Sequence, residues 1–477
     1  MSAPGRPSSG LPSAVVSPEA WARAHEELVA DLRALIRIPT VNPPGDEIRA
    51  ARHVETLLAD LGLRPEVVEP FPDRGSVACR LRGDGTGGAP LLLLSHLDVV
   101  PAPPEGWTHE PFGADIADGY VWGRGAVDMK GTVAMELGVI RRLVAEARAA
   151  GRDPASDPIP GLRRDLLFAS TADEEAGGHE GAGWVAEHRP DWLRADAALN
   201  EAGGVSMAVA GRTFYPIGVA EKGYAVYRLT VRGAWGHASM PREENAAVRA
   251  AALIARLAEP GRPRLTPVME RFFSAAAEQL PAPAAVLVRR IAGPDPAASQ
   301  AALEQLCAEP YRRAARALLR DSISVGVVTA GVKYNVIPGI AAVEIDCRVL
   351  PGTTEEQMRA EVERRVGPDL APHVDVELLG FGEPVEAPLD HPLYRVMAET
   401  LRDHDPDAIP LPVMAPFATD AKHTVKLGVP TYGFSPLHND PRETWLERFH
   451  GVDERVGLEA LRFGLPVLYD VVRRYCG

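Results

Sequence analysis

The spacing of apolar residues along the chain predicts alternating helices and strands. Apolar positions recur at helical spacing after Ser17-Pro18-Glu19, which is typical of a helix start with Ser as N-cap and Pro in the first turn. Short apolar runs then predict buried strands, with helices between them. This alternation is typical of an α/β domain with a mainly parallel sheet. The predicted helices lie at about 47–61 and 131–149, and the strands at 77–81, 90–95 and 166–170.

The pattern changes after about Lys222. Predicted strands at 224–231, 323–329 and 340–349 flank a helix at 245–257 and a long, proline-punctuated helical stretch ending near Leu319. Helix and strand alternation resumes at Thr353. We therefore predict an interrupted α/β domain with an inserted α+β domain, behind a disordered tail. The predicted bounds are 1–17 for the tail, 18–221 and 350–477 for the interrupted domain, and 222–349 for the insertion.

Composition narrows the class of protein. The chain has 477 residues, 46% of them hydrophobic and 24% charged, as in globular proteins. Its net charge of −14 disfavours general binding to nucleic acid or to anionic membranes. The four cysteines are scattered, and the first residues lack the long apolar core of a signal peptide, so we expect a reducing, cytoplasmic location. Any metal must then be held by His, Asp and Glu.

Five segments with acidic or histidine residues lie where predicted strands end. In the first, a buried strand presents His96 and Asp98 on one face, because side chains repeat every second residue. One can bind a metal while the other orients it, although a structural His–Asp pair explains the fragment equally well. In the second, Asp128 stands where a glycine-rich turn enters a helix. A carboxylate there can bridge two cations, and the alternative is a helix N-cap.

The third segment carries three consecutive carboxylates, Asp173, Glu174 and Glu175, directly after a strand. They repel one another unless cations or protons compensate. Glu175 can ligate a metal while Glu174 faces a metal-bound water as general base; a solvated acidic loop is the alternative. Glu201, in the fourth segment, is a single acid after another short strand and indicates little alone. His450, in the fifth segment, is by itself more typical of a loop residue than of a metal ligand.

Together these segments supply two imidazoles and three metal-binding carboxylates, from His96, Asp128, Glu175, Glu201 and His450. Two Zn²⁺ ions carry four positive charges, which three carboxylates and a bridging hydroxide cancel. The set therefore suits a dinuclear hydrolytic site, in which metals lower the pKa of water and polarise a carbonyl.

These five segments, in this order, resemble the dinuclear zinc amidohydrolases that include aminoacylase, carboxypeptidase G, carboxypeptidase S and succinyl-diaminopimelate desuccinylase. The resemblance covers nearly the whole chain after the tail. It implies two zinc ions, with Co²⁺ or Mn²⁺ as substitutes. One zinc would be held by His96, Asp128 and Glu201, and the other by Asp128, Glu175 and His450, with Asp128 bridging.

The same resemblance assigns roles to further residues. Glu174 is the general base, and Asp98 is the catalytic acid beside His96. The inserted domain is a lid that often dimerises. Its Gly236-His237-Ala238-Ser239 segment matches the family's lid histidine, which polarises the scissile carbonyl, often from the partner subunit.

Two further matches concern the substrate carboxylate. Asn335, in Asn335-Val336-Ile337-Pro338, and Arg348 match positions that hold it. An arginine fork suits a carboxylate bidentately. Taken alone, Asn335 is typical of a turn, and Arg348 of an ion pair with Asp346.

The chain departs from the family pattern at three positions. Ala418 and Lys422 stand where the family usually has Gly and Arg, and Asp453 replaces an Asn. None of them is an expected metal ligand, so the changes bear on substrate fit or loop geometry. The helical stretch at about 266–319, with Ala330-Gly331-Val332-Lys333, looks most like the carboxypeptidase S branch.

The sequence therefore predicts a dizinc hydrolase of amide bonds next to a free carboxylate, acting on an N-acyl amino acid or a short peptide. A dizinc-bridged hydroxide attacks, Glu174 moves the proton and His237 stabilises the oxyanion. We expect no nucleic-acid or membrane partner, and a homodimer through the lid.

Three alternatives stay open at this point. A non-catalytic scaffold of the same fold is disfavoured by the intact ligand set, and a two-metal phosphoesterase by the net negative charge. A serine or cysteine hydrolase is disfavoured because no Gly-x-Ser-x-Gly segment occurs.

Overall fold

The computed structural model of the protein describes residues 16–309, 311–443 and 445–477. The chain forms two compact units. The first contains the chain up to Gly218 with Ala387–Leu411 and Thr419–Gly477, and the second contains Val219–Glu386 with Pro412–Ala418. Residues 1–15 of the predicted tail lie outside the described residues. Ser17 is the N-cap of the first helix, as predicted, and its side chain accepts from the Ala20 amide at 3.2 Å.

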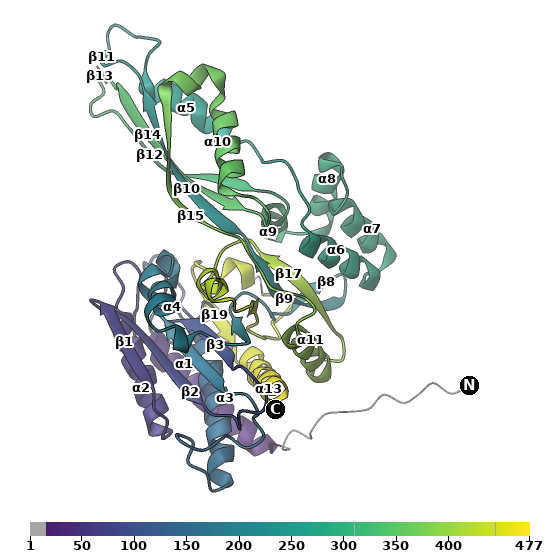
Figure 1. Ribbon diagram of the computed structural model, residues 1–477. Coiled ribbons are helices and arrows are strands. Elements are labelled where there is room, and N and C mark those ends of the chain that lie inside the picture. Colours follow the sequence, from purple (N-terminus) through teal and green to yellow (C-terminus); the bar gives the residue numbers. More distant parts are fainter. Residues whose placement is uncertain (1–15, 310, 444) are drawn as a thin grey trace. The chain divides into compact units, whose positions relative to one another are not determined.

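The first unit is built on a sheet whose central strands are parallel, in the order β6-β3-β7-β18. Antiparallel β2 and β1 extend the β6 side (Figure 1). The run Leu91–Leu94 in β3 is buried throughout, as expected for a parallel strand covered on both faces. The bounds are β1 Glu66–Phe71, β2 Arg74–Leu81, β3 Leu91–His96, β6 Leu166–Thr171, β7 Ala197–Asn200 and β18 Thr431–Gly433.

Further strands complete the sheets of this part of the chain. On the β18 side, β9 pairs antiparallel and is joined by β8 and β17. A separate small sheet has the order β19-β5-β4. The bounds are β4 Ile116–Ala117, β5 Tyr120–Trp122, β8 Met207–Val209, β9 Arg212–Glu221, β17 Ala408–Ala415 and β19 Arg455–Gly457.

Three long helices of the first unit, α1, α3 and α13, pack against one another, and α3 and α13 also contact β3. The ammonium of Lys130, at the start of α3, is fully buried and donates to the carbonyl of Leu35 in the last turn of α1 and to that of Ile38 just after the helix. This contact satisfies carbonyls that a helix end leaves free. The bounds are α1 Pro18–Ile36, α2 Glu47–Asp60, α3 Lys130–Ala149, α4 Trp184–His188, α11 Pro392–His404, α12 Ala421–Thr424 and α13 Leu458–Cys476.

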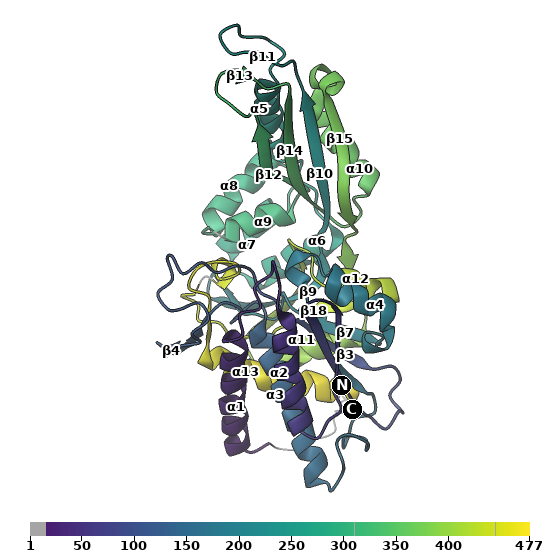
Figure 2. The same cartoon turned by 90° about the vertical axis from the view of Figure 1, so that its left-hand side faces the viewer.

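The second unit contains an antiparallel sheet in the order β12-β14-β10-β15, whose strands lie side by side in Figure 2. A two-stranded pair, β11 with β13, and a short strand, β16, belong to the same unit. The bounds are β10 Gly223–Arg232, β11 Gly236–His237, β12 Ser322–Ala330, β13 Val336–Ile337, β14 Ile340–Val349, β15 Val374–Gly382 and β16 Val385–Glu386.

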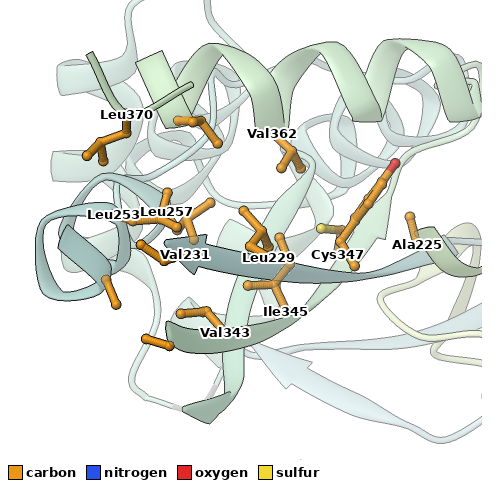
Figure 3. Packing of buried hydrophobic residues seen from close by; sticks show 14 of the residues in the cluster. Ala225, Leu229, Val231, Leu253, Leu257, Val343, Ile345, Cys347, Val362 and Leu370 are labelled. Atoms are coloured by element: carbon orange, nitrogen blue, oxygen red, sulfur yellow. The ribbon is translucent and has the colours of Figure 1, made fainter. Parts of the chain in front are cut away.

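Helices α5 (Ala246–Leu257) and α10 (Glu355–Leu370) cover one face of this sheet. The alternation predicted for 224–231 is present, since every second side chain of β10 is buried. Figure 3 shows Leu229 of β10, Ile345 of β14 and Val362 of α10 in the resulting core. A half-buried sheet of this kind gives the period-two pattern that made its strands predictable.

The proline-punctuated stretch forms four helices between α5 and β12. They are α6 Pro267–Gln279, α7 Ala282–Ile291, α8 Pro296–Leu306 and α9 Tyr311–Leu318. The side chain of Lys222 is fully buried, and its ammonium donates to the carbonyls of Ala317 and Arg320 and to Ser322 Oγ. The end of this helical stretch is therefore fixed to the start of the sheet.

The predicted fold class, a mixed α/β fold with a largely parallel central sheet, is confirmed. The predicted insertion at 222–349 lies within the second unit, which also contains α10 and β15. These elements belong there because β15 pairs with β10 along 224–231 and α10 packs on the same core. Among the described residues, no helix has the length and apolar character needed to span a bilayer.

Candidate metal centre and active site

Five side chains of the first unit form two groups that share Asp128. Asp128 Oδ1 lies 3.2 Å from His96 Nε2, and its Oδ2 lies 3.3 Å from His450 Nε2. Glu201 completes the first group, 3.7 Å from His96 Nε2, and Glu175 the second, 3.1 Å from His450 Nε2. Within each group the donor atoms lie within 4.8 Å of one another. The structure thus brings together all five residues predicted as metal ligands.

The parallel sheet explains this convergence. His96 ends β3, Glu201 directly follows β7, and Glu175 lies in a 3₁₀ turn shortly after β6. Since β6, β3 and β7 are parallel neighbours, their carboxyl ends meet at one edge of the sheet. Asp128 lies just before α3, and His450 lies in the loop before β19.

Asp98 fixes the orientation of the first group. His96 Nδ1 donates to the Asp98 carbonyl oxygen at 3.1 Å, and because a carbonyl only accepts, Nδ1 carries the hydrogen. The other ring nitrogen, Nε2, faces Asp128 Oδ1 at 3.2 Å. The Asp98 carboxylate accepts from the backbone amides of Glu174 and Glu175 at 3.1 and 3.0 Å. Asp98 therefore links the His96 ring to the turn that carries both glutamates.

Glu174 lies beside Lys422, a residue of the short helix α12. Lys422 Nζ is 3.6 Å from Glu174 Oε1, and both side chains are largely buried. Burial raises the pKa of Glu174 well above its ordinary value, and the Lys422 ammonium opposes this shift. From the sequence, Lys422 was noted only as a departure from a family pattern, and its contact with Glu174 was not predicted.

The centre concentrates negative charge away from water. Burial and the neighbouring Asp128 raise the pKa of Glu201 to about 8, and burial also raises the pKa of Glu175. Hydrogen bonds to Asp128 and Glu175 raise the pKa of His450 to about 10. Cations relieve such a concentration of carboxylates. Imidazole and carboxylate donors without a thiolate fit zinc, cobalt or manganese, so the residues present suit a pair of divalent metals.

A buried arginine contacts the turn that carries Glu174 and Glu175 through the neighbouring Asp173. Arg74 of β2 donates to Asp173 at 3.1 Å and to Asn42 at 3.0 Å. Asn42 Nδ2 in turn donates to Asp98 at 2.9 Å. Neither Arg74 nor Asn42 was predicted as a site residue, because each lies in a segment with no local motif.

The other predicted site residues lie in the second unit. His237 is exposed on β11, and its Nδ1 is 2.7 Å from Ser239 Oγ. Asn335 is its near neighbour, because β11 pairs with β13 and the Ala238 amide donates to the Asn335 carbonyl. The buried Oδ1 of Asn335 has no hydrogen-bond partner among the described residues.

Arg348 lies elsewhere in the same unit, paired with Asp346 at 2.9 Å. It opposes Tyr224 and Ser322, at the far end of β14 from Ile340. Arg348 lies eight positions after Ile340 along the strand, which is roughly 26 Å at about 3.3 Å per residue. Within one copy of this unit, Arg348 therefore does not meet His237 or Asn335.

Residues 92–474 match the family described as Peptidase family M20/M25/M40. The chain belongs to this family. The matched region includes every residue of the two metal-binding groups. The predicted family resemblance is thereby confirmed.

Relatives of this M20 protein match it over most of its length. The N-fatty-acyl-amino acid synthase/hydrolase PM20D1 of Xenopus tropicalis is 27% identical over 458 residues, covering 92% of this chain and 84% of that protein. Aminoacylase-1 of Mus musculus is 28% identical over 455 residues, covering 91% and 95%. The M20 metallo-carboxypeptidase Sso-CP2 of Sulfolobus solfataricus shares the fold, with a TM-score of 0.68 at 18% identity over 94% of this chain and 99% of that one. This M20 protein is thus a metal-dependent hydrolase of C–N bonds.

Proposed function

We propose that this protein hydrolyses the amide bond of N-acyl amino acids or short peptides, next to a free carboxylate. The observation that carries the proposal concerns the Asp128 carboxylate, which has one oxygen beside His96 and the other beside His450. Glu174 lies on the turn whose amides donate to Asp98. The names of the similar hydrolases PM20D1 and aminoacylase-1 support this substrate class.

The two groups would hold one divalent metal each, with Asp128 contributing to both. Zinc is the proposed ion, with cobalt or manganese as substitutes, because the donors are imidazole nitrogens and carboxylate oxygens. When bound, such ions acidify water and polarise the scissile carbonyl.

Glu174 would act as the general base. It takes a proton from the attacking water and passes it to the leaving nitrogen, which requires a carboxylate basic enough to bind the proton transiently. Burial of Glu174 supplies that basicity, and Lys422 moderates it. Asp98 holds the turn in place through the amides of Glu174 and Glu175. The proposed role of Asp98 is to hold Glu174, Glu175 and His96 in fixed relative positions.

Substrate recognition would involve two copies of the chain. His237 would stabilise the oxyanion, and Asn335 and Arg348 would hold the substrate carboxylate. Arg348 lies at the end of β14 far from the β11–β13 pair, which carries His237 and has Asn335 beside it. This separation favours a site completed by a second copy, with His237 and Asn335 from one copy and Arg348 from the other. The edge strand β12 would form the dimer contact, since Val327 and Val328 are 46% and 51% exposed there.

The test is a substrate screen with the full-length protein. Chelator-treated protein is reloaded with Zn²⁺, Co²⁺ or Mn²⁺ and assayed on N-acyl amino acids, dipeptides and phosphate esters. We expect amide hydrolysis that chelation abolishes and metal restores. Each substrate is paired with its carboxyl-amidated form, which should be cleaved poorly. Phosphate-ester cleavage alone, or equal cleavage of the amidated forms, would contradict the proposal. Absence of stoichiometric metal would favour the scaffold alternative.

A further inference from the structure

Beyond its five ligands, the candidate centre depends on how two separate loops are held together. Asp128 lies in the turn between β5 and α3, whereas His450 lies in the loop before β19. More than 300 residues separate them in the chain, yet Asp128 Oδ2 and His450 Nε2 lie 3.3 Å apart. Some feature of the fold must fix this distance, because neither residue belongs to a regular element there.

Glu454 is the residue that joins the two loops. Its carboxylate is fully buried, and Oε1 accepts from the backbone amides of Val127 and Asp128 at 2.8 and 3.1 Å. Its Oε2 accepts from Arg124 at 2.6 Å, and Arg124 donates again to the Gly451 carbonyl at 3.0 Å. The Gly123 amide donates to the Glu454 carbonyl at 2.9 Å. The buried ion pair of Glu454 and Arg124 therefore holds the backbone beside both Asp128 and His450.

The loop held by this pair has an unusual backbone. His450 and Asp453 both have positive φ, at 57° and 56°, which residues other than glycine rarely adopt. Such conformations persist where the surroundings fix them. Glu454 and Arg124 supply this support on one side of the loop. On the other side, Thr108 donates from its amide and its hydroxyl to Asp453.

The two metal-binding groups depend unequally on these contacts. In the second group, Asp128 and His450 both lie on segments that Glu454 and Arg124 hold. In the first group only Asp128 lies on such a segment, because His96 and Glu201 are placed by the ends of β3 and β7. A change at Glu454 should therefore disturb the second group more than the first.

We propose that Glu454, through its ion pair with Arg124, is a positioning residue that sets the spacing of Asp128 and His450 and so the metal affinity of their group. This inference rests on the proposed metal centre. Loss of partners that orient metal ligands typically lowers metal affinity by about 10- to 100-fold. We expect that loss at one of the two sites.

The experiment is a titration of full-length apoprotein with Zn²⁺ against a chromophoric chelator, for wild type and Glu454→Gln. Gln keeps the size of the side chain but cannot form the ion pair. We expect one dissociation constant to rise about 10-fold or more and the other to stay within about 3-fold. The Co²⁺ absorption spectrum should likewise change for one ion and not for the other.

Further variants identify the affected site. In a His450→Ala background, adding Glu454→Gln should change the remaining Zn²⁺ affinity little, because both substitutions act on the same group. Arg124→Lys keeps the charge but not the forked contact, and it carries the test if Glu454→Gln does not fold. Asp31→Asn is the control, since it breaks a partly buried ion pair with Arg141 that joins α1 to α3 instead of the ligand loops.

Each result has a distinct meaning. Equal weakening of both sites, unchanged affinity at both, or the same loss in Asp31→Asn would overturn the inference. A wild-type protein that binds no Zn²⁺ would instead overturn the proposed function.

Discussion

The ammonium of Lys422 lies 3.6 Å from the carboxylate of Glu174, and both side chains are about nine-tenths buried. Burial of a carboxylate favours its protonated form, whereas a neighbouring cation favours its charged form. In Glu174 this arrangement lies on the turn that also carries Glu175, one of the proposed ligands.

Glu174→Gln tests the proposed base directly. The amide cannot take up a proton, so kcat should fall by about 10²- to 10⁴-fold, the usual contribution of general acid–base catalysis. Metal content should stay at the wild-type value, because Glu174 belongs to neither ligand group. Steady-state kinetics and plasma mass spectrometry measure the two quantities. The exposed Glu187→Gln on α4 is the control, and wild-type turnover in Glu174→Gln would exclude this role.

Asp128→Ala and His450→Ala should differ in metal stoichiometry. Asp128 contributes an oxygen to both groups, whereas His450 belongs to one. We therefore expect Asp128→Ala to weaken both metals and His450→Ala to weaken one, with the other retained after dialysis. Metal analysis of proteins dialysed side by side is sufficient. The shared role of Asp128 fails if its variant retains one tightly bound ion.

Mixing two inactive variants tests whether His237 acts in a second copy. Glu174→Gln and His237→Ala should each have low activity alone. If His237 completes the partner's site, each mixed dimer regains one intact site, and random exchange in a two-fold dimer restores about a quarter of wild-type activity. The variants are co-expressed with different tags, so that the mixed dimer can be purified and assayed. A pure mixed dimer without regained activity would show that His237 does not act in trans.

Glu136 gives a prediction about stability and pH. It lies fully buried on α3, where its carboxylate accepts from Ser95 Oγ at 2.7 Å, and burial raises its pKa to about 8. Between the ordinary glutamate pKa of about 4.3 and pH 8, the unfolded chain releases this proton while the folded protein keeps it. This group therefore lowers stability progressively as pH rises through that range.

Glu136→Gln should remove that pH dependence. We expect the melting temperature of the variant, relative to wild type, to rise from pH 5 to pH 8, because each unit of pKa shift is worth about 1.4 kcal/mol. Differential scanning calorimetry at the two pH values measures it, with Glu187→Gln as the exposed control. A difference between variant and wild type that is the same at both pH values would contradict the assignment.

Local patterns predicted much of the fold and the proposed ligands. The run Leu91–Leu94 is apolar at every position because β3 is buried on both faces, and His96 follows it at the carboxyl end. The carboxylates after β6 and β7 follow the same rule. These features were readable because each depends on residues that are adjacent in the chain.

Contacts between segments that are distant in the chain could not be predicted from local patterns. In the sequence, Arg124 is only an arginine beside glycines, and Glu454 is only an acid close to a histidine. Their ion pair exists only in the folded protein. The same holds for Arg74, which meets Asp173 and Asn42 only in the folded unit. The extent of the second unit likewise depends on the pairing of β15 with β10, which spacing within one segment cannot reveal.

The buried ammonium of Lys222 limits how this enzyme can be redesigned. Its donations to the carbonyls of Ala317 and Arg320 attach the four-helix stretch between α5 and β12 to the first residues of the sheet. Replacing that stretch by a short loop would leave a charged group buried without those acceptors, a costly state in a protein interior. A trimmed variant would therefore need Lys222→Met or Lys222→Leu as well. The helices of the insertion and the side chain at position 222 should be exchanged together when chimaeras between M20 enzymes are built.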